Sequence, residues 1–177
     1  GGGIGISYKP NEKKFNYKEY SKIVEYFSKH HNCKIIFEPG RALLGNSAIL
    51  VTKIIYIKKT AKKNFVILDA GMNDFIRPAL YNTEHQIMPT KKNQNIYIKK
   101  NTDFVGPICE SSDKFLNTTK FQKINEKDVL IISDVGAYGM SLASNYNLRP
   151  KPMELLVRKN KCQIIRKREN LIKLINE

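Results

Sequence analysis

Cysteine, acidic residues and long apolar runs are all scarce in this chain of 177 residues. Its three cysteines (Cys33, Cys109 and Cys162) are odd in number and widely spaced, which favours a reducing compartment over a disulfide framework and matches no metal site. No apolar run approaches the roughly 20 residues needed to span a bilayer. The chain opens on glycines, not on a charged region followed by an apolar core, so we expect no secretory signal. These absences predict a cytoplasmic protein with no bound metal and no membrane partner.

The 16 acidic residues are outnumbered by 31 basic ones, which leaves a net charge of +15. Such an excess can indicate nucleic-acid binding. However, the chain has 25 lysines but 6 arginines, and it is also rich in isoleucine (22) and asparagine (17), a bias that A- and T-rich codons produce. The lysines are scattered in expected loops and strand ends. We therefore predict no nucleic-acid partner, and a basic nucleic-acid-binding module is the weakest alternative.

The first 44 residues have the order of a βα unit. The glycine turn Gly1–Gly5 can bring backbone N–H groups close to an anion, and apolar residues at helical spacing cover residues 17–30. Lys34–Phe37 is then expected to be a short buried strand. This order predicts that residues 1–44 are the closing βα units of a (β/α)8 barrel, where phosphate often binds after the last strands.

From residue 45 the sequence changes to short runs rich in Ile, Val, Tyr and Phe, separated by turn residues. We expect strands at Ile49–Ile57, Phe65–Leu68, Gln86–Met88, Ile96–Ile98, Phe104–Ile108, Val129–Ile132, Leu155–Val157 and Gln163–Ile165. Residues 91–95 and 117–127 are expected to be solvated loops, and residues 168–176 a terminal helix. The predicted fold class is therefore α/β + β, in which residues 45–177 form an antiparallel β-barrel or sandwich domain.

The tetrapeptide Glu38-Pro39-Gly40-Arg41 follows the first expected strand. Pro39 fixes the backbone and Gly40 removes a side chain, so a ligand can lie against the main chain. A carboxylate and a guanidinium are then held apart, which suits a flat cofactor with a pyridine nitrogen at one end and an anion at the other. An ordinary turn with a surface ion pair explains the tetrapeptide about as well.

Arg77, Tyr81 and Tyr138 form a second group of candidate binding residues. Arg77 and Tyr81 are four residues apart, one turn of a helix. Arg77 can clamp a carboxylate through two hydrogen bonds, and Tyr81 adds a hydroxyl donor. Tyr138 lies between Gly136 and Gly139, so its ring can project from a sharp turn. The alternative is ordinary packing, with a structural arginine and half-buried tyrosines.

The segment Gly106–Asp113 places a thiol and a carboxylate side by side, just after a turn. Cys109 can deliver a proton, and Glu110 can bind a cationic group. The other two cysteines, Cys33 and Cys162, flank expected strands and are interpreted as small apolar core residues. The histidines are interpreted as helix-cap or surface residues and not as ligands: His30, His31 and His85.

Read together, these segments resemble the C-terminal portion of the diaminopimelate decarboxylases, which belong to the alanine-racemase-like class of pyridoxal-phosphate enzymes. The resemblance extends from the glycine turn to Met153–Val157. It is most specific in three segments: Asp69–Tyr81, Gly106–Asp113 and Gly136–Asn147. The Glu38–Arg41 tetrapeptide is shared by many relatives. Ornithine decarboxylases look similar around Cys109 but carry Asp-Gly where this chain has Glu110 and Ser111.

The resemblance implies a pyridoxal 5'-phosphate enzyme that removes carbon dioxide from meso-2,6-diaminopimelate to give L-lysine, a step of lysine biosynthesis. It implies that the cofactor is held by Gly3, Glu38, Pro39, Gly40, Arg41 and Tyr138. It implies that the substrate is bound by Arg41, Arg77, Tyr81, Glu110 and Tyr138. Arg77 and Tyr81 would take the distal carboxylate and Glu110 the distal ammonium. Glu38 would keep the pyridine nitrogen protonated, so that the ring acts as an electron sink, and Cys109 would be the catalytic proton donor.

In the family, the residues equivalent to Cys109 and Glu110 come from a second subunit. The resemblance therefore implies a homodimer, whose active site forms between the barrel of one subunit and the β domain of its partner. The family's cofactor-anchoring lysine and ring-stacking histidine would precede Gly1, and no lysine of this chain matches that context. We therefore expect a fragment of a longer enzyme, inactive by itself.

Two alternatives stay open. The nearer one is a related decarboxylase acting on ornithine, arginine or a carboxylated polyamine, although a substrate without a distal carboxylate has no use for Arg77. The other is a non-catalytic homologue that regulates an active partner. The joint presence of Cys109, Glu110 and Tyr138 argues against this second alternative.

Overall fold

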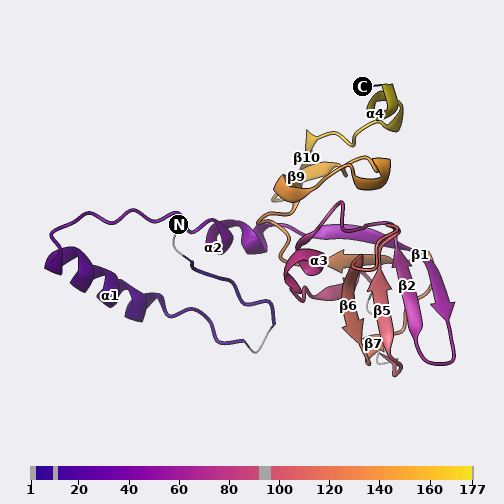
Figure 1. Ribbon diagram of the computed structural model, residues 1–177, viewed down its shortest axis with the longest axis horizontal. Coiled ribbons are helices and arrows are strands. Elements are labelled where there is room, and N and C mark those ends of the chain that lie inside the picture. The colour runs from indigo at the N-terminus through magenta and orange to yellow at the C-terminus, as the bar shows by residue number, and fades with distance from the viewer. Residues whose placement is uncertain (1–2, 10–11, 92–96, 177) are drawn as a thin grey trace.

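The computed structural model describes residues 3–9, 12–91 and 97–176, and consists of a long arm and a curled sheet (Figure 1). The N-terminal arm (residues 3–9 and 12–44) extends away from the sheet and has α1 (Tyr17–His30) near its far end. The chain returns through α2 (Gly40–Leu44) and a 3-10 turn, η1 (Gly45–Ser47). The chain therefore passes from the arm into the sheet through the segment that begins with the Glu38–Arg41 tetrapeptide.

Local chemistry explains where α1 begins and ends. The Asn16 side chain caps the helix by accepting a hydrogen bond from the backbone N–H of Glu19 at 3.1 Å. Glu19 lies in the first turn and Lys29 in the last, where each charge suits the helix dipole. The helix predicted for residues 17–30 is confirmed. None of its residues is buried, although its bounds match the sequence pattern.

The strand predicted for Lys34–Phe37 is wrong. Residues 34–37 form no strand, and Ile36 is 77% exposed. A strand needs a neighbour that pairs with its N–H and C=O groups, and no strand of the described ranges lies beside this segment. Cys33, which we predict to be a core residue, is also exposed, because the segment that follows it is not part of a sheet.

Six strands form the main sheet, in the order β3-β8-β1-β2-β5-β6. Their bounds are β1 Leu50–Lys59, β2 Asn64–Leu68, β3 Ile87–Pro89, β5 Thr102–Val105, β6 Lys114–Thr118 and β8 Val129–Ile132. Neighbouring strands are antiparallel, as predicted, except β2 and β5, which are parallel with Val66 opposite Phe104. The exception arises because a long crossover joins β2 to β5, whereas a hairpin would reverse the strand direction.

Two small sheets and four short helices complete the fold. β4 (Tyr97–Ile98) pairs with β7 (Phe121–Gln122), and β9 (Glu154–Arg158) forms a hairpin with β10 (Lys161–Arg166). The short helices are α3 (Arg77–Tyr81), η2 (Met140–Leu142), η3 (Tyr146–Leu148) and α4 (Leu171–Asn176). The predicted terminal helix is confirmed by α4.

Two predictions for this region are wrong, and two others fall partly on residues that the structure does not describe. The loop predicted for residues 117–127 contains β7, and Phe121 is buried 4.6 Å from the ring of Phe104. Cys162 is exposed and not in the core, because every residue of β10 is exposed. Of the loop predicted at 91–95, residues 92–95 lie outside the described residues, as does Ile96 of a predicted strand.

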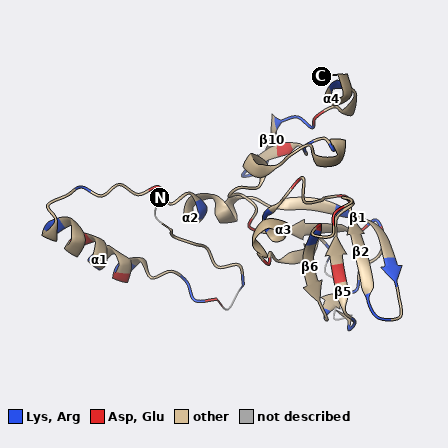
Figure 2. Cartoon of the chain, viewed as in Figure 1, with Lys and Arg blue, Asp and Glu red and all other residues tan. Residues whose placement is uncertain are grey.

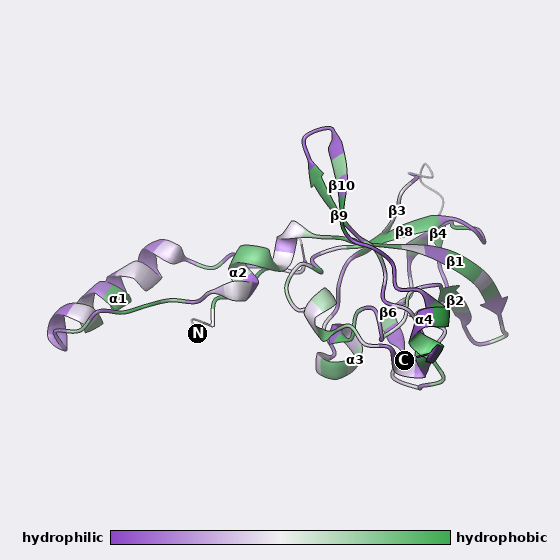
Figure 3. Cartoon of the chain, turned by 90° about the horizontal axis from the view of Figure 1, so that it is seen from above, coloured by the Kyte–Doolittle hydropathy of each residue, from purple (hydrophilic) through white to green (hydrophobic). Residues whose placement is uncertain are grey.

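The hydrophobic core lies in the main sheet. Its fully buried members are Ile54, Leu68, Phe104, Leu130 and Ile132, each 0% exposed. Burying side chains of this size contributes about 1.5–3 kcal/mol each, so these positions dominate the stability of the sheet. Other apolar segments lie outside the core, at α2 and on the β9–β10 hairpin (Figure 3).

Positive charge is distributed along the chain (Figure 2). Lys and Arg lie on α1, on α2, in the main sheet and in the C-terminal segment, so no single element concentrates them. Among the described helices, none is long and apolar enough to cross a membrane. Nor do the described His, Cys, Asp and Glu residues form a cluster that could hold a metal ion.

Candidate active site

Side chains from separate parts of the chain line a cavity of about 390 Å³: Arg41, Arg77, Tyr81, Thr83 and Tyr138. Arg41 comes from α2, Arg77 and Tyr81 come from α3, and Tyr138 comes from the turn after β8. Apart from Thr83, each is a residue that the sequence predicts to bind the substrate. The structure therefore brings together four of the five predicted substrate-binding residues, and only Glu110 of that set lies elsewhere.

Arg77 is the most unusual residue of this cavity, because its side chain is charged yet only 4% exposed. Its guanidinium lies over the ring of Tyr81, 5.3 Å from the centroid, and over that of Tyr138 at 5.4 Å. One terminal nitrogen donates a hydrogen bond to the hydroxyl of Tyr8 at 3.3 Å. Within the described ranges, no acidic side chain pairs with Arg77. A buried cation without a counter-ion is costly, so the site favours an anionic ligand.

Tyr138 owes its position to the two glycines that flank it. The residue has a left-handed backbone, with φ at +64°. A side chain at Gly136 would overlap the backbone carbonyl of Leu44, and one at Gly139 would overlap the carbonyl of Val135. Close backbone approach therefore requires glycine at both positions, and it presents the Tyr138 ring from a tight turn, as the sequence predicts.

The same close approach explains why Arg41 and Tyr138 share a cavity. The N–H of Gly136 donates to the carbonyl of Gly45 at 3.0 Å, which ties the Tyr138 turn to the segment just after α2. Because Arg41 lies in α2, this contact sets the distance between two residues that are far apart in the sequence.

The other residues predicted to hold a cofactor do not line this cavity. Gly3 has a left-handed backbone, with φ at +61°, and a side chain there would meet open space. Gly40, at the start of α2, is equally open, and Glu38 beside it is exposed. Open backbone of this kind leaves room for a flat ring and its phosphate. Gly1 and Gly2 lie outside the described residues.

The loop that carries Cys109 and Glu110 is held from inside by Asp113. The Asp113 carboxylate accepts hydrogen bonds from the backbone N–H groups of Met72 at 2.7 Å and of Ile108 at 2.8 Å. A side chain at Gly106 would overlap this carboxylate, so the loop requires glycine there. Burial raises the pKa of Asp113 above its ordinary value, although these two N–H donors oppose the rise.

Cys109 and Glu110 do not line the cavity that contains Arg77. Both are exposed, and the Glu110 carboxylate accepts a hydrogen bond of 3.5 Å from the hydroxyl of Tyr146. One copy of the chain therefore brings together the predicted carboxylate-binding residues but not the predicted proton donor.

Sequence reasoning misjudged His85, which we predict to be a cap or surface residue. It is 2% exposed and packs edge-on between Tyr8 and Phe75, at centroid distances of 4.8 and 4.7 Å. Its Nδ1 lies 2.9 Å from the carbonyl oxygen of Ser133. Burial lowers the pKa of His85, so the ring is neutral at neutral pH. His30 and His31 are exposed at the end of α1, as predicted.

Two further residues of the site were missed. The hydroxyl of Thr83 is buried beside the cavity and has no hydrogen-bond partner among the residues that the structure describes. Tyr8 reaches Arg77 from the N-terminal arm. No spacing or motif in the sequence marks Thr83 as a binding residue. The proximity of Tyr8 to the glycine turn is the one sequence signal that could have marked it.

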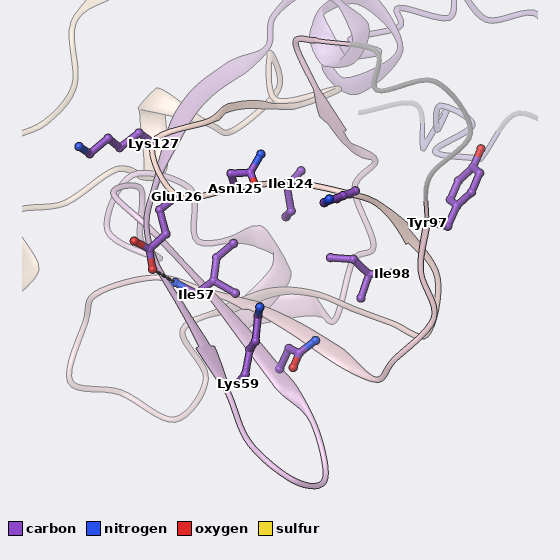
Figure 4. Close-up of a pocket in the computed structure, with 10 residues that line it drawn as sticks. Ile57, Lys59, Tyr97, Ile98, Ile124, Asn125, Glu126 and Lys127 are labelled. Carbon is purple, nitrogen blue, oxygen red and sulfur yellow. Dashed lines mark hydrogen bonds between the residues drawn. The ribbon is translucent and has the colours of Figure 1, made fainter.

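A larger cavity, of about 690 Å³, lies elsewhere in the molecule and contains none of the predicted site residues. Figure 4 shows Ile57, Ile98 and Ile124 around Lys59, and Glu126 accepting a hydrogen bond from the backbone N–H of Ile57 at 3.1 Å. The smaller cavity is therefore the candidate site because predicted residues line it, and not because of its volume.

Comparison with known proteins identifies the family of the chain. Residues 14–136 match the family described as "Pyridoxal-dependent decarboxylase, C-terminal sheet domain". The chain belongs to this family. Among its curated relatives, the diaminopimelate decarboxylase of Helicobacter pylori is 44% identical over 171 residues, which are 97% of this chain and 42% of the relative. That of Aquifex aeolicus is 40% identical over 172 residues, which are 96% of this chain and 40% of the relative. The chain therefore spans only 40% to 42% of the length of these relatives.

Solved structures of decarboxylases superpose on most of the chain. The diaminopimelate decarboxylase of H. pylori complexed with L-lysine is 43% identical and superposes with a TM-score of 0.87, over 99% of this chain and 42% of that one. The lysine/ornithine decarboxylase of Vibrio vulnificus is 19% identical with a TM-score of 0.69, over 82% of this chain and 40% of that one, so it shows the fold alone. The predicted resemblance to the diaminopimelate decarboxylases is confirmed, as is the sheet domain of the predicted fold.

Proposed function

We propose that this chain is the part of a pyridoxal-phosphate-dependent diaminopimelate decarboxylase that recognises the far end of the substrate. The reaction would release carbon dioxide from meso-2,6-diaminopimelate and give L-lysine. The observation that carries the proposal is Arg77, a buried guanidinium without an acidic partner among the described residues, held between two tyrosines at a cavity. A free amino acid with a second carboxylate would supply the missing anion.

Arg77 and Tyr81 bind the distal carboxylate in this proposal. The guanidinium can donate two parallel hydrogen bonds to a carboxylate, and the tyrosine hydroxyl can donate a third. A diamine without that carboxylate would leave Arg77 buried and unpaired, so the site would reject ornithine strongly. The enzyme would then discriminate against a wrong substrate because that substrate leaves the Arg77 guanidinium without a counter-ion.

The residues that would hold pyridoxal phosphate are Gly3, Glu38, Pro39, Gly40, Arg41 and Tyr138. The open backbone at Gly3 and Gly40 and the cation of Arg41 fit a phosphate and a flat ring. When bound, the cofactor supplies an electron sink for the charge left by departing carbon dioxide. Glu38 would face the pyridine nitrogen and keep its proton in place.

We propose that a second copy of the chain supplies Cys109 and Glu110. Both are exposed and lie outside the cavity of their own copy, which is the arrangement that a shared site requires. The partner's Glu110 would bind the distal ammonium, and its Cys109 would deliver a proton to the carbon that has lost carbon dioxide. The active unit would therefore be a homodimer.

The N-terminal arm supports the predicted division into residues 1–44 and 45–177. No residue of α1 is buried, and Ile36 and Leu43 are 77% and 71% exposed. Such apolar exposure suits the closing units of a (β/α)8 barrel whose other units would cover it. A lysine-producing enzyme of this kind would work in the cytoplasm.

The test is a substrate comparison on the complete enzyme that carries this chain. We expect carbon dioxide release from meso-diaminopimelate and little from ornithine or arginine. Arg77→Met keeps length and apolar contact but removes the charge, and we expect kcat/KM to fall about a hundredfold or more. Arg158→Met, at an exposed arginine of β9, is the matched control and should be unchanged.

Three outcomes would contradict the proposal. Preference for ornithine or arginine, with Arg77→Met active, would favour the related decarboxylases. A complete protein that binds no cofactor and co-purifies with an active relative would favour the regulatory alternative. Full activity of Arg77→Met on meso-diaminopimelate would remove the assigned role of the arginine.

A further inference from the structure

Tyr8 contacts Arg77 from the N-terminal arm. Its hydroxyl accepts a hydrogen bond from a terminal nitrogen of Arg77 at 3.3 Å, and it does not itself line the cavity. Arg77 lies 69 residues further along the chain, so this contact joins the N-terminal arm to α3. The same guanidinium lies over the rings of Tyr81 and Tyr138.

Tyr8 is itself held in place by three independent contacts. Its ring packs edge-on against the buried ring of His85, with 4.8 Å between centroids. Its carbonyl oxygen accepts a hydrogen bond from the Gln86 side chain at 3.2 Å, and its N–H donates to the Glu12 carboxylate at 2.7 Å. The phenol is therefore anchored by neighbours that do not touch the cavity.

We propose that Tyr8 is a positioning residue, which fixes the orientation of Arg77 for the distal carboxylate of the substrate. The inference rests on the proposed function, since it gives Arg77 that carboxylate as its ligand. Tyr8 does not touch the substrate. Its hydroxyl accepts a hydrogen bond from one terminal nitrogen of the guanidinium, and the remaining N–H groups would bind the carboxylate.

The physical basis is the rotamer freedom of arginine. Ordering a free arginine side chain costs roughly 1.5–2 kcal/mol of rotamer entropy. If the side chain becomes ordered only when the ligand binds, this cost weakens the binding free energy. If a hydroxyl already holds the guanidinium in place before the ligand binds, the entropy is lost during folding and no longer weakens binding. Loss of the hydroxyl should therefore weaken binding of carboxylate ligands and leave other ligands unaffected.

Tyr8→Phe tests this in the complete enzyme, because it removes the hydroxyl and keeps the ring against His85. We expect KM for meso-diaminopimelate to rise about three- to tenfold with kcat within about twofold, which corresponds to the loss of one ordinary hydrogen bond. The sharper measurement uses two inhibitors. L-lysine keeps the carboxylate that Arg77 would bind, and cadaverine is the same diamine without it.

Inhibition by L-lysine should weaken to the same extent as KM rises, whereas inhibition by cadaverine should stay as in the unmodified enzyme. Tyr56→Phe, at a half-exposed tyrosine of β1, is the matched control and should change neither. Equal weakening for both inhibitors would show a merely structural role and overturn the inference, as would unchanged KM and L-lysine inhibition. If the unmodified enzyme does not act on meso-diaminopimelate, the proposed function fails first.

Discussion

The N-terminal arm and the main sheet respond differently to the same kind of sequence signal. In α1, Ile23 and Phe27 occupy the apolar side of a correctly predicted helix, yet they are 62% and 50% exposed. In the sheet, Ile54 and Phe104 occupy the apolar side of predicted strands and are 0% exposed. A periodic pattern therefore fixes the local structure, but burial also requires a second element that covers the apolar side.

The largest expected effect is on the core of the sheet. Phe104→Ala removes a fully buried ring that packs on Phe121, and we expect it to lower the free energy of unfolding by about 3–5 kcal/mol. Ile23→Ala in α1, the comparison variant, should change it by less than about 1 kcal/mol, because that side chain is already largely exposed. Urea unfolding followed by circular dichroism measures both.

A similar loss of unfolding free energy in both variants would contradict the contrast between a buried sheet and an exposed helix α1. It would show that α1 is covered in solution, by a second copy of the chain or by further parts of the protein. Sedimentation of the two variants would separate these causes, since only association between copies depends on concentration.

The next effect concerns the joint between the arm and the sheet. Gly136→Ala places a methyl group against the carbonyl of Leu44, at the point where the two regions touch. We expect about 1–3 kcal/mol of destabilisation, and a displaced Tyr138 that weakens substrate binding in the complete enzyme. Unfolding curves and KM for meso-diaminopimelate give the two readouts. Gly5→Ala, where an added methyl group meets open space, is the stability control.

If Gly136→Ala is as stable as the unmodified chain, the backbone at Leu44 can move away from the Tyr138 turn without cost. The shared cavity of Arg41 and Tyr138 would then not depend on this contact. The contrast between a covered sheet and an uncovered arm would remain, but the joint would lose its role in building the site.

The sequence predicts well what depends on neighbours within a few residues. The bounds of α1 follow from the Asn16 cap and the apolar spacing, and the pairing of Arg77 with Tyr81 follows from one helical turn. What depends on distant partners was missed. Lys34–Phe37 has a strand-like composition but no neighbour to pair with, and Cys162 lies on a hairpin that nothing in the described residues covers.

The candidate site divides in the same way. Arg77, Tyr81 and Tyr138 were found because each has a local signal, a helical spacing or flanking glycines. Tyr8 and His85 were not, because Tyr8 contacts Arg77 and His85 across 69 and 77 residues of sequence, and a periodic pattern does not encode such contacts. The inferred role for Cys109 stays a prediction, since it concerns a second copy of the chain.

The smallest expected effect is a difference in acid stability between a buried carboxylate in the sheet and an exposed one in the arm. Asp103 in β5 is 5% exposed, and burial opposes its charge, yet hydrogen bonds from Lys114, Lys63 and Asn117 outweigh this and lower its pKa from 3.8 to about 2. A carboxyl whose pKa is lower in the folded state stabilises the fold fully above its unfolded pKa. This contribution, up to about 2 kcal/mol, should be lost as the pH falls from about 4 to 2.

Asp103→Asn should therefore flatten the acid limb of a stability profile measured by urea unfolding between pH 5 and 2. Glu25→Gln is the counterpart in the arm, where the Glu25–Lys29 pair is 65% and 76% exposed and Lys29 lowers the pKa of Glu25. Its acid limb should stay that of the unmodified chain, because solvent screens an exposed pair. Equal changes in both variants would mean that burial does not decide the strength of these charges, and the distinction between arm and sheet would not extend to electrostatics.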